Sequence, residues 1–122
     1  MLLHIISKSD LERAKASGEI APPSLESEGF VHCSYPDQLL IPANQRFHGR
    51  SDLVALVLNP AAIAQPLVVE DSYGSGTSFP HVYGPIPMDA IDRVIDFQPE
   101  PDGSFVLPPA LRDSSHPDPE SS

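Results

Sequence analysis

Prolines and glycines interrupt this chain so often that long helices are disfavoured. Fifteen prolines and seven glycines are spread over 122 residues. Proline removes a backbone donor and breaks helix interiors, and both residue types are typical of defined turns. We therefore expect many short elements joined by tight connections. A chain of this length builds one hydrophobic core, so we predict a single globular domain over residues 1–111.

Apolar runs and capping residues predict where the elements lie. We expect strands at residues 2–6, 30–33, 52–58, 67–71, 79–83, 91–97 and 105–107. A Ser-x-x-Glu capping box from Ser9 to Glu12 predicts a helix that ends before Gly18. Ser34 is expected to cap a second helix, kinked or split at Pro42. One-turn helices are expected at residues 60–63 and 88–90, with a turn or half-helix at residues 25–29.

Composition restricts the partners and the location of the protein. The formal net charge of −10 disfavours nonspecific binding to nucleic acid or to an anionic membrane. No apolar run is long enough to span a bilayer, and the first residues lack the features of a secretory signal, so we expect a cytoplasmic protein. Residues 112–122 contain no apolar anchor and predict a disordered polar and acidic tail.

Two segments, residues 28–34 and 79–85, each place a histidine among apolar residues. In a strand, His32 faces away from Val31 and Cys33, whereas His81 and Tyr83 share a face. Each histidine is interpreted either as a ligand-facing group or as a core histidine bonded to backbone. For the aromatic pair, the alternative to a binding site is packing that holds the loop.

Other residues offer chemistry, each with a structural alternative. Arg46 could hold a phosphate, or it and Arg50 could pair with nearby carboxylates. Cys33, the only cysteine, is interpreted as a buried hydrophobe in preference to a nucleophile activated by His32 or His81. Tyr73, in a Gly/Ser loop, could stack on a bound ring, although partly buried packing is the commoner role. We predict no metal site, because His32 and Cys33 point apart.

The two histidine segments, with Ala43-Asn44, residues 52–54 and His4 in the first strand, resemble domain-of-unknown-function family 952 over about residues 2–108. This resemblance implies an ADP-ribosyltransferase-like fold: a single α+β domain with a split, strongly bent mixed sheet and two or three short helices. Sites of that fold use a first-strand histidine that holds a ribose hydroxyl, a role that His4 matches by position. They also use a carboxylate that polarises the ribose, which Glu28 or Glu70 could supply.

Three classes of function follow. The first is a binding module for a nucleotide or an ADP-ribose-like ligand such as NAD, recognised through His4, His32, Ser34, Arg46, His81 and Tyr83. The second is an enzyme that transfers or hydrolyses an ADP-ribosyl or phosphate group in the same groove, with His4, His32, Glu28 and Glu70 as the catalytic candidates. The third is a protein-interaction domain whose histidines serve only the fold.

Overall fold

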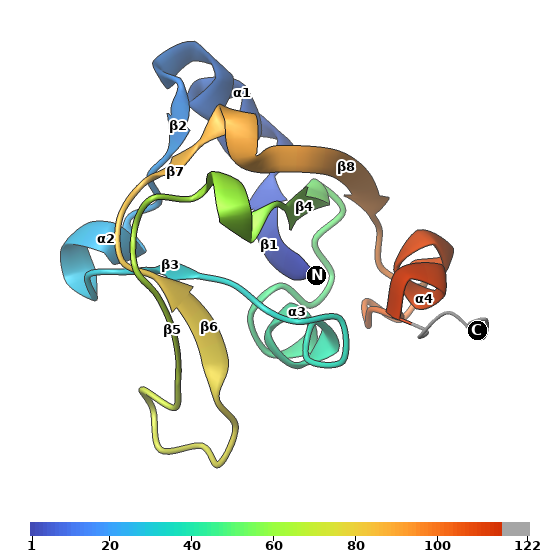
Figure 1. Cartoon of the computed structure of the whole chain (residues 1–122). Coiled ribbons are helices and arrows are strands. Elements are labelled where there is room, and N and C mark those ends of the chain that lie inside the picture. The colour runs from blue at the N-terminus through green and yellow to red at the C-terminus, as the bar shows by residue number, and fades with distance from the viewer. Residues whose placement is uncertain (116–122) are drawn as a thin grey trace.

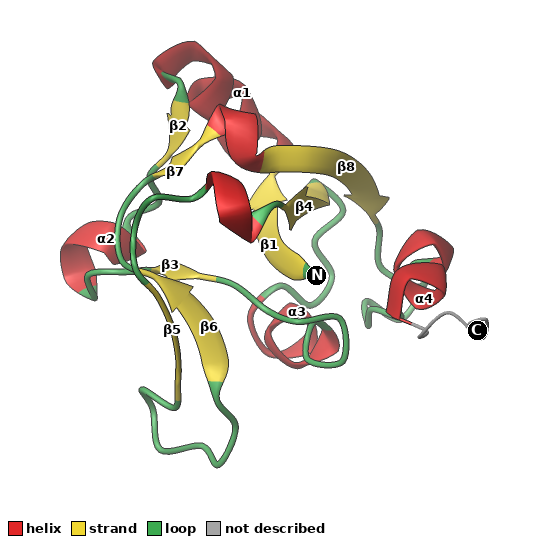
Figure 2. Ribbon diagram, in the orientation of Figure 1, coloured by secondary structure: helices red, strands yellow, loops and turns green. Residues whose placement is uncertain are grey.

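The elements of the protein are short, and turns and longer loops connect them (Figures 1 and 2). The computed structural model describes residues 1–115. The strands are β1 (Leu2–Ser7), β2 (Glu19–Ile20), β3 (Val31–His32), β4 (Leu53–Leu58), β5 (Leu67–Glu70), β6 (Phe79–Val82), β7 (Ile86–Pro87) and β8 (Ile91–Phe97). The α-helices are α1 (Lys8–Ser17), α2 (Ser24–Ser27), α3 (Leu40–Arg46) and α4 (Pro109–Ser115), with 3-10 turns η1 (Pro60–Ala62) and η2 (Met88–Ala90).

Three small sheets make up the α+β architecture, in the orders β1-β4-β8, β2-β7 and β3-β6-β5. Every strand pairing in the described residues is antiparallel, so the predicted mixed sheet is wrong. Because no strands pair in parallel within residues 1–115, these sheets need no helical crossover connection. In the first sheet, Leu2 pairs with Leu58 and Leu53 pairs with Phe97. All six residues of the central strand β4 are buried, as its continuous apolar run predicts.

The first and third sheets meet at one isolated bridge between Leu3 and Ser34. The amide of each residue donates to the carbonyl of the other, at 2.8 Å in both directions. Two hydrophobic clusters lie on opposite sides of β1 and β4, one containing Leu2 and Leu56 and the other containing Leu3 and Phe97. The bridge therefore fixes the third sheet, which carries both histidine segments, beside the first strand.

The helices differ from the prediction in number and in their caps. Residues 1–115 contain four α-helices, where two or three were expected. Ser7, rather than Ser9, caps α1, because its Oγ accepts from the Asp10 amide at 3.1 Å. The predicted cap at Ser34 is wrong, since its backbone is used in the bridge and α3 begins only at Leu40. Pro42 is the third residue of α3, where a missing N–H costs no helical hydrogen bond.

The C-terminal segment also departs from the sequence-based expectation. Residues 105–107 do not form a strand, because the side-chain amide of Asn44 takes the backbone groups of Phe105. Asn44 Oδ1 accepts from the Phe105 amide at 2.7 Å, and Nδ2 donates to its carbonyl at 3.3 Å. Helix α4, anchored by the fully buried Leu111, extends to Ser115 and so takes the first four residues of the predicted tail. Residues 116–122 of that tail lie outside the described residues.

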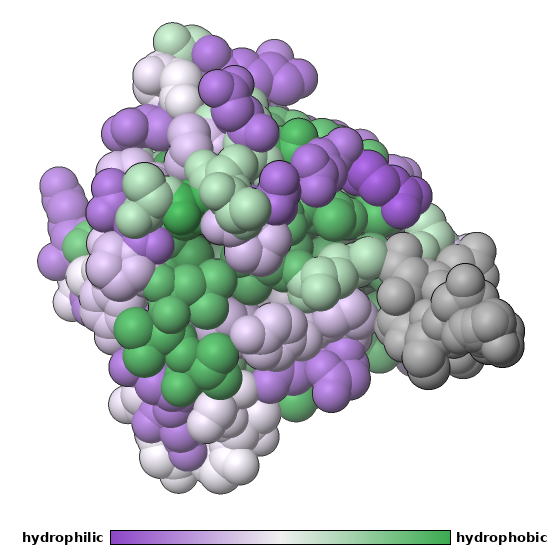
Figure 3. All heavy atoms as spheres, viewed as in Figure 1, coloured by the Kyte–Doolittle hydropathy of each residue, from purple (hydrophilic) through white to green (hydrophobic). Residues whose placement is uncertain are grey.

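Several large apolar side chains are exposed on the surface. Val68 and Val69 of β5 are 39% and 49% exposed, and Figure 3 shows a hydrophobic area in the region of this strand. Among residues 1–115, no helix is both long enough and apolar enough to cross a membrane.

Candidate functional site

The two histidine segments are neighbouring strands, and their histidines lie directly opposite each other. His32 of β3 pairs with His81 of β6, and their ring centroids are 5.5 Å apart at an interplanar angle of 77°. Val31 and Cys33 point into the hydrophobic core, as the strand alternation predicts. The pairing of β3 with β6 thus brings together two imidazoles that are far apart in the sequence.

Phe30 holds both imidazoles in place from one side. Its ring stacks on His81 with centroids 3.9 Å apart and an interplanar angle of 11°, and it meets His32 edge-on at 5.0 Å. Phe30 is 5% exposed, so the stack forms part of the packed interior. Sequence reasoning did not single out this residue; its place two positions before His32, on the same face of an extended segment, is the signal that could have found it.

Glu28 and Tyr73 fix the outer side of His32. His32 Nε2 lies 2.7 Å from Glu28 Oε1 and 3.3 Å from the Tyr73 hydroxyl, which donates to Glu28 Oε2 at 2.5 Å. The hydrogen bonds from Tyr73 and His32 lower the pKa of Glu28. Burial lowers the pKa of His32, and the nearby charge of Arg46 adds to this, although Glu28 opposes it. The His32 ring is therefore neutral. Its Nε2 carries the proton and donates a hydrogen bond to the Glu28 carboxylate.

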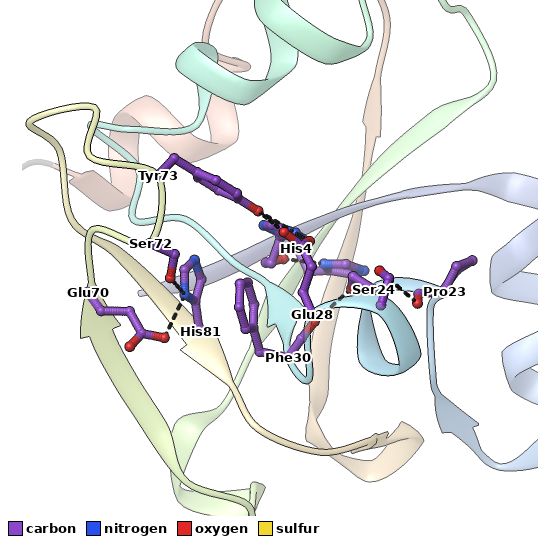
Figure 4. A network of polar contacts seen from close by, with 11 residues as sticks. His4, Pro23, Ser24, Glu28, Phe30, Glu70, Ser72, Tyr73 and His81 are labelled. Carbon is purple, nitrogen blue, oxygen red and sulfur yellow. Dashed lines mark hydrogen bonds and ion pairs between the residues drawn. The ribbon is translucent and has the colours of Figure 1, made fainter.

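A second carboxylate, Glu70, holds His81 in a similar way. Glu70 Oε2 lies 2.9 Å from His81 Nδ1 and also accepts from the Tyr83 hydroxyl. These two hydrogen bonds, the one from Tyr83 first, lower the pKa of Glu70. The shared partner confirms that His81 and Tyr83 face the same way. His81 is only 1% exposed, and Figure 4 shows Glu70 and Ser72 on one side of its ring.

His4 joins the site from β1, across the seam between the sheets. Its Nδ1 donates to the carbonyl of His32 at 2.6 Å. The ring is 7% exposed, and burial lowers its pKa. Because a carbonyl only accepts, the proton of the neutral ring sits on Nδ1, and Nε2 is left as a hydrogen-bond acceptor.

Two adjoining cavities, which we call together the histidine groove, lie against these residues. The first, of about 320 Å³, is lined by residues that include His32, His81, Tyr73 and Thr77. The second, of about 240 Å³, is lined by residues that include His4, Ser7, Ser24 and Arg50. His32, Ser34, Pro42 and Arg46 line both. The two cavities therefore lie next to each other, with these four residues in the walls of both.

Arg46 supplies positive charge at the centre of the groove. Its guanidinium lies 5.6 Å from the centre of the Tyr73 ring, and it forms no ion pair within residues 1–115. Arg50 differs, since it makes hydrogen bonds of 3.0 and 2.6 Å to the carboxylate of Asp52, as the structural alternative predicted. Arg46 is thus the arginine available to an anionic ligand.

Some of the predicted site residues lie behind the groove and do not line it. Glu28, Glu70 and Tyr83 are absent from the lining of both cavities, and the two carboxylates bond the histidines that do line it. Ser34 is 5% exposed, lines both cavities, and its hydroxyl has no hydrogen-bond partner in the described part of the chain. Tyr73 lines the first cavity. Its position in a Gly/Ser loop is the sequence feature that points to a binding role.

The surroundings of Cys33 bear on two further roles, as a nucleophile and as a metal ligand. Burial raises the pKa of the Cys33 thiol to about 12, which disfavours the thiolate that a nucleophile or a zinc ligand needs. Within residues 1–115, no group of three or more histidine, cysteine or carboxylate side chains is arranged to hold a metal ion.

Comparisons with known proteins give a family and a fold. The crystal structure of protein CC0527 from Caulobacter crescentus is similar with a TM-score of 0.81 and 29% identity, covering 91% of this chain and 97% of that one. The solution NMR structure of CC0527 gives a TM-score of 0.74 and 30% identity, covering 87% and 91%. None of the curated proteins compared with the chain matches it. The model of the family described as "Protein of unknown function (DUF952)" matches residues 5–94, so the chain belongs to the DUF952 family.

Proposed function

We propose that the protein binds a nucleotide or an ADP-ribose-like small molecule in the histidine groove, on an ADP-ribosyltransferase-like fold. The observation that carries this proposal is the position of Arg46, an arginine without an ion pair in the described residues, between two cavities lined by imidazoles. A ligand that fits must carry both an anionic group and several hydrogen-bond donors. A phosphorylated ribose has both.

The hydroxyl groups of a ribose match the acceptors in the groove. In the neutral rings of His4 and His32, the nitrogen bonded to a carbonyl or carboxylate oxygen carries the proton. The other nitrogens, Nε2 of His4 and Nδ1 of His32, are acceptors, and neither has a hydrogen-bond partner within residues 1–115. Two imidazole acceptors in the histidine groove favour a ligand that carries hydroxyl groups.

A phosphate group matches Arg46. The protein as a whole carries a formal charge of −10, which repels anions, so local recognition of an anion depends on an arginine that forms no ion pair with a carboxylate in the described residues. A guanidinium can form a two-pronged hydrogen bond to a phosphate. Tyr73 lines the first cavity and is 50% exposed, so a base could pack against its ring.

The size of the groove also agrees with a small ligand. Its two cavities measure about 320 and 240 Å³. Sites for small molecules occupy roughly 300 to 1,000 Å³ and combine apolar walls with a few convergent polar groups.

The test is a titration followed by NMR, with two arginine variants. NAD, ADP-ribose and simple nucleotides are added to millimolar concentration while amide and imidazole signals are recorded. We expect shifts at His4, His32 and His81, and an affinity that falls about tenfold or more in Arg46→Gln, the loss of one charge-assisted hydrogen bond. Arg93→Gln, the matched control, removes an arginine that lines neither cavity and keeps the wild-type affinity.

The absence of any shift with every ligand would overturn this proposal. In that case, a stability loss in His32→Ala and His81→Ala with no ligand-dependent difference supports the interaction-domain alternative.

A further inference from the structure

We propose that His32 and His81 form an acid–base pair that hydrolyses a cyclic phosphodiester of a nucleotide held by Arg46. This inference rests on the nucleotide binding proposed above, and it adds a reaction and a substrate class to the same groove. It comes from the facing imidazoles, the carboxylates behind them and the guanidinium that shares their cavity.

The two imidazoles are arranged for opposite proton transfers. Each is held at one nitrogen by a carboxylate, Glu28 for His32 and Glu70 for His81, and each keeps its second nitrogen without a partner in the described residues. A carboxylate on one nitrogen fixes the tautomer and stabilises the imidazolium when the other nitrogen takes up a proton. Because both rings line the first cavity with centroids 5.5 Å apart, one bound group can reach both.

The carboxylates are not placed to attack the substrate themselves. Neither Glu28 nor Glu70 lines the groove, so each acts as a positioning residue through its histidine. Cys33 is equally unsuited as a nucleophile, since its buried thiol has its pKa raised to about 12. The groove therefore favours direct attack by water, assisted by imidazole, over a covalent enzyme intermediate.

The reaction balances without a further reactant. His32, kept neutral by burial, accepts a proton from water at Nδ1 as the water oxygen forms a bond to phosphorus. The bond from phosphorus to one ribose oxygen breaks, and a protonated His81 gives its Nε2 proton to that oxygen. The product is a phosphomonoester with a free ribose hydroxyl. Proton exchange with solvent then returns both imidazoles to the forms in which they began the reaction.

Charge and cavity size select a single cyclic nucleotide as the substrate. In the described residues, Arg46 is the only lysine or arginine that lines the first cavity, which suits one phosphate group. The formal charge of −10 disfavours a polymer with many phosphates. Hydrolysis of a small cyclic diester needs one site for a phosphate group, one water molecule and two proton transfers. Arg46 can bind the phosphate, and the two imidazoles can transfer the protons.

The experiment uses the full chain and 2′,3′-cyclic AMP, followed by 31P NMR, which separates the diester from the monoester. We expect the wild type to form monoester, and His32→Gln to reduce the rate about 100-fold or more, the usual contribution of one acid–base group. His32 has 27% of its side chain exposed, so this variant is suited to folding normally. His48→Gln is the matched control, because His48 lines neither cavity, and it keeps the wild-type rate.

Two further variants separate catalysis from structure. Glu70→Gln keeps a side chain of the same shape behind His81, and a positioning role predicts a displaced pH–rate profile together with a lower rate. Arg46→Gln raises KM more than it lowers kcat if the guanidinium mainly binds the phosphate. A purely structural role for either residue predicts an unchanged pH profile and an unchanged KM.

Different results would overturn the proposed binding and the proposed hydrolysis. Shifts with AMP in the NMR titration but no monoester from the wild type would overturn the hydrolysis and leave the proposed binding in place. A rate that is unchanged in His32→Gln would also overturn it and would assign the turnover to another enzyme in the preparation. No NMR shift with any nucleotide would overturn both proposals.

Discussion

The burial of His4 makes the free energy of unfolding depend on pH, and a substitution of His4 can measure the part of this dependence that comes from its ring. The ring is 7% exposed, and burial lowers its pKa below the ordinary value of 6.5. Below pH 6.5, the unfolded chain binds a proton at this position and the folded chain does not. The free energy of unfolding therefore falls as the pH decreases.

The magnitude follows from the burial. If the folded ring stays neutral, lowering the pH from 7.5 to 5.5 costs about 1.4 kcal/mol from this one group, which is about 5 °C in Tm for a domain of this size. His32 adds a change of the same sign, because its pKa is also lowered. Carboxylates whose pKa is lowered, such as Glu28, lose their contribution only at more acidic pH.

The assay compares urea unfolding of the wild type and of His4→Asn at several pH values between 5.5 and 7.5. The asparagine amide can replace the Nδ1–H bond to the His32 carbonyl, but it does not titrate. We expect the stability of the variant to fall by about 1.4 kcal/mol less than that of the wild type over this range. Parallel pH curves for the two proteins would refute the conclusion that the folded ring resists protonation.

Three further substitutions or reagents test other parts of the structure. Asn44→Ala removes both hydrogen bonds to the Phe105 backbone and is expected to cost about 2 kcal/mol in urea unfolding; a loss near zero would contradict the anchoring role. Gly103→Ala is expected to lower the free energy of unfolding by more than ~1 kcal/mol, because φ is +90° and the new Cβ would lie 2.6 Å from the His48 ring. Adding His48→Ala should restore only the part of this loss that comes from the clash. Cys33 is expected to react with a thiol reagent only after unfolding, since it is 3% exposed, and rapid labelling of the native protein would contradict its burial.

Much of the fold follows from patterns along the chain. The unbroken apolar run of β4 predicts a central buried strand, and alternation along β6 predicts that His81 and Tyr83 share a face. Both predictions are confirmed. They depend only on strand geometry, which a single sequence contains.

The rest depends on which segments meet, and a single sequence does not contain that information. The register between β3 and β6 decides that His32 faces His81, and the fold of the 71–78 loop decides that Tyr73 reaches Glu28. The same limit explains the error at residues 105–107, where an amide from helix α3 replaces a partner strand.

The order of the strands in the first sheet has a consequence for how the chain reaches its native state. The central strand β4 pairs with β1 near the N-terminus, with Leu2 opposite Leu58, and with β8, with Leu53 opposite Phe97. Neither pairing is a local hairpin, so each closes a long loop of chain before it gains contacts. We expect the refolding rate to be slow for a domain of this size, and we expect the first sheet to be incomplete in a nascent chain that lacks β8.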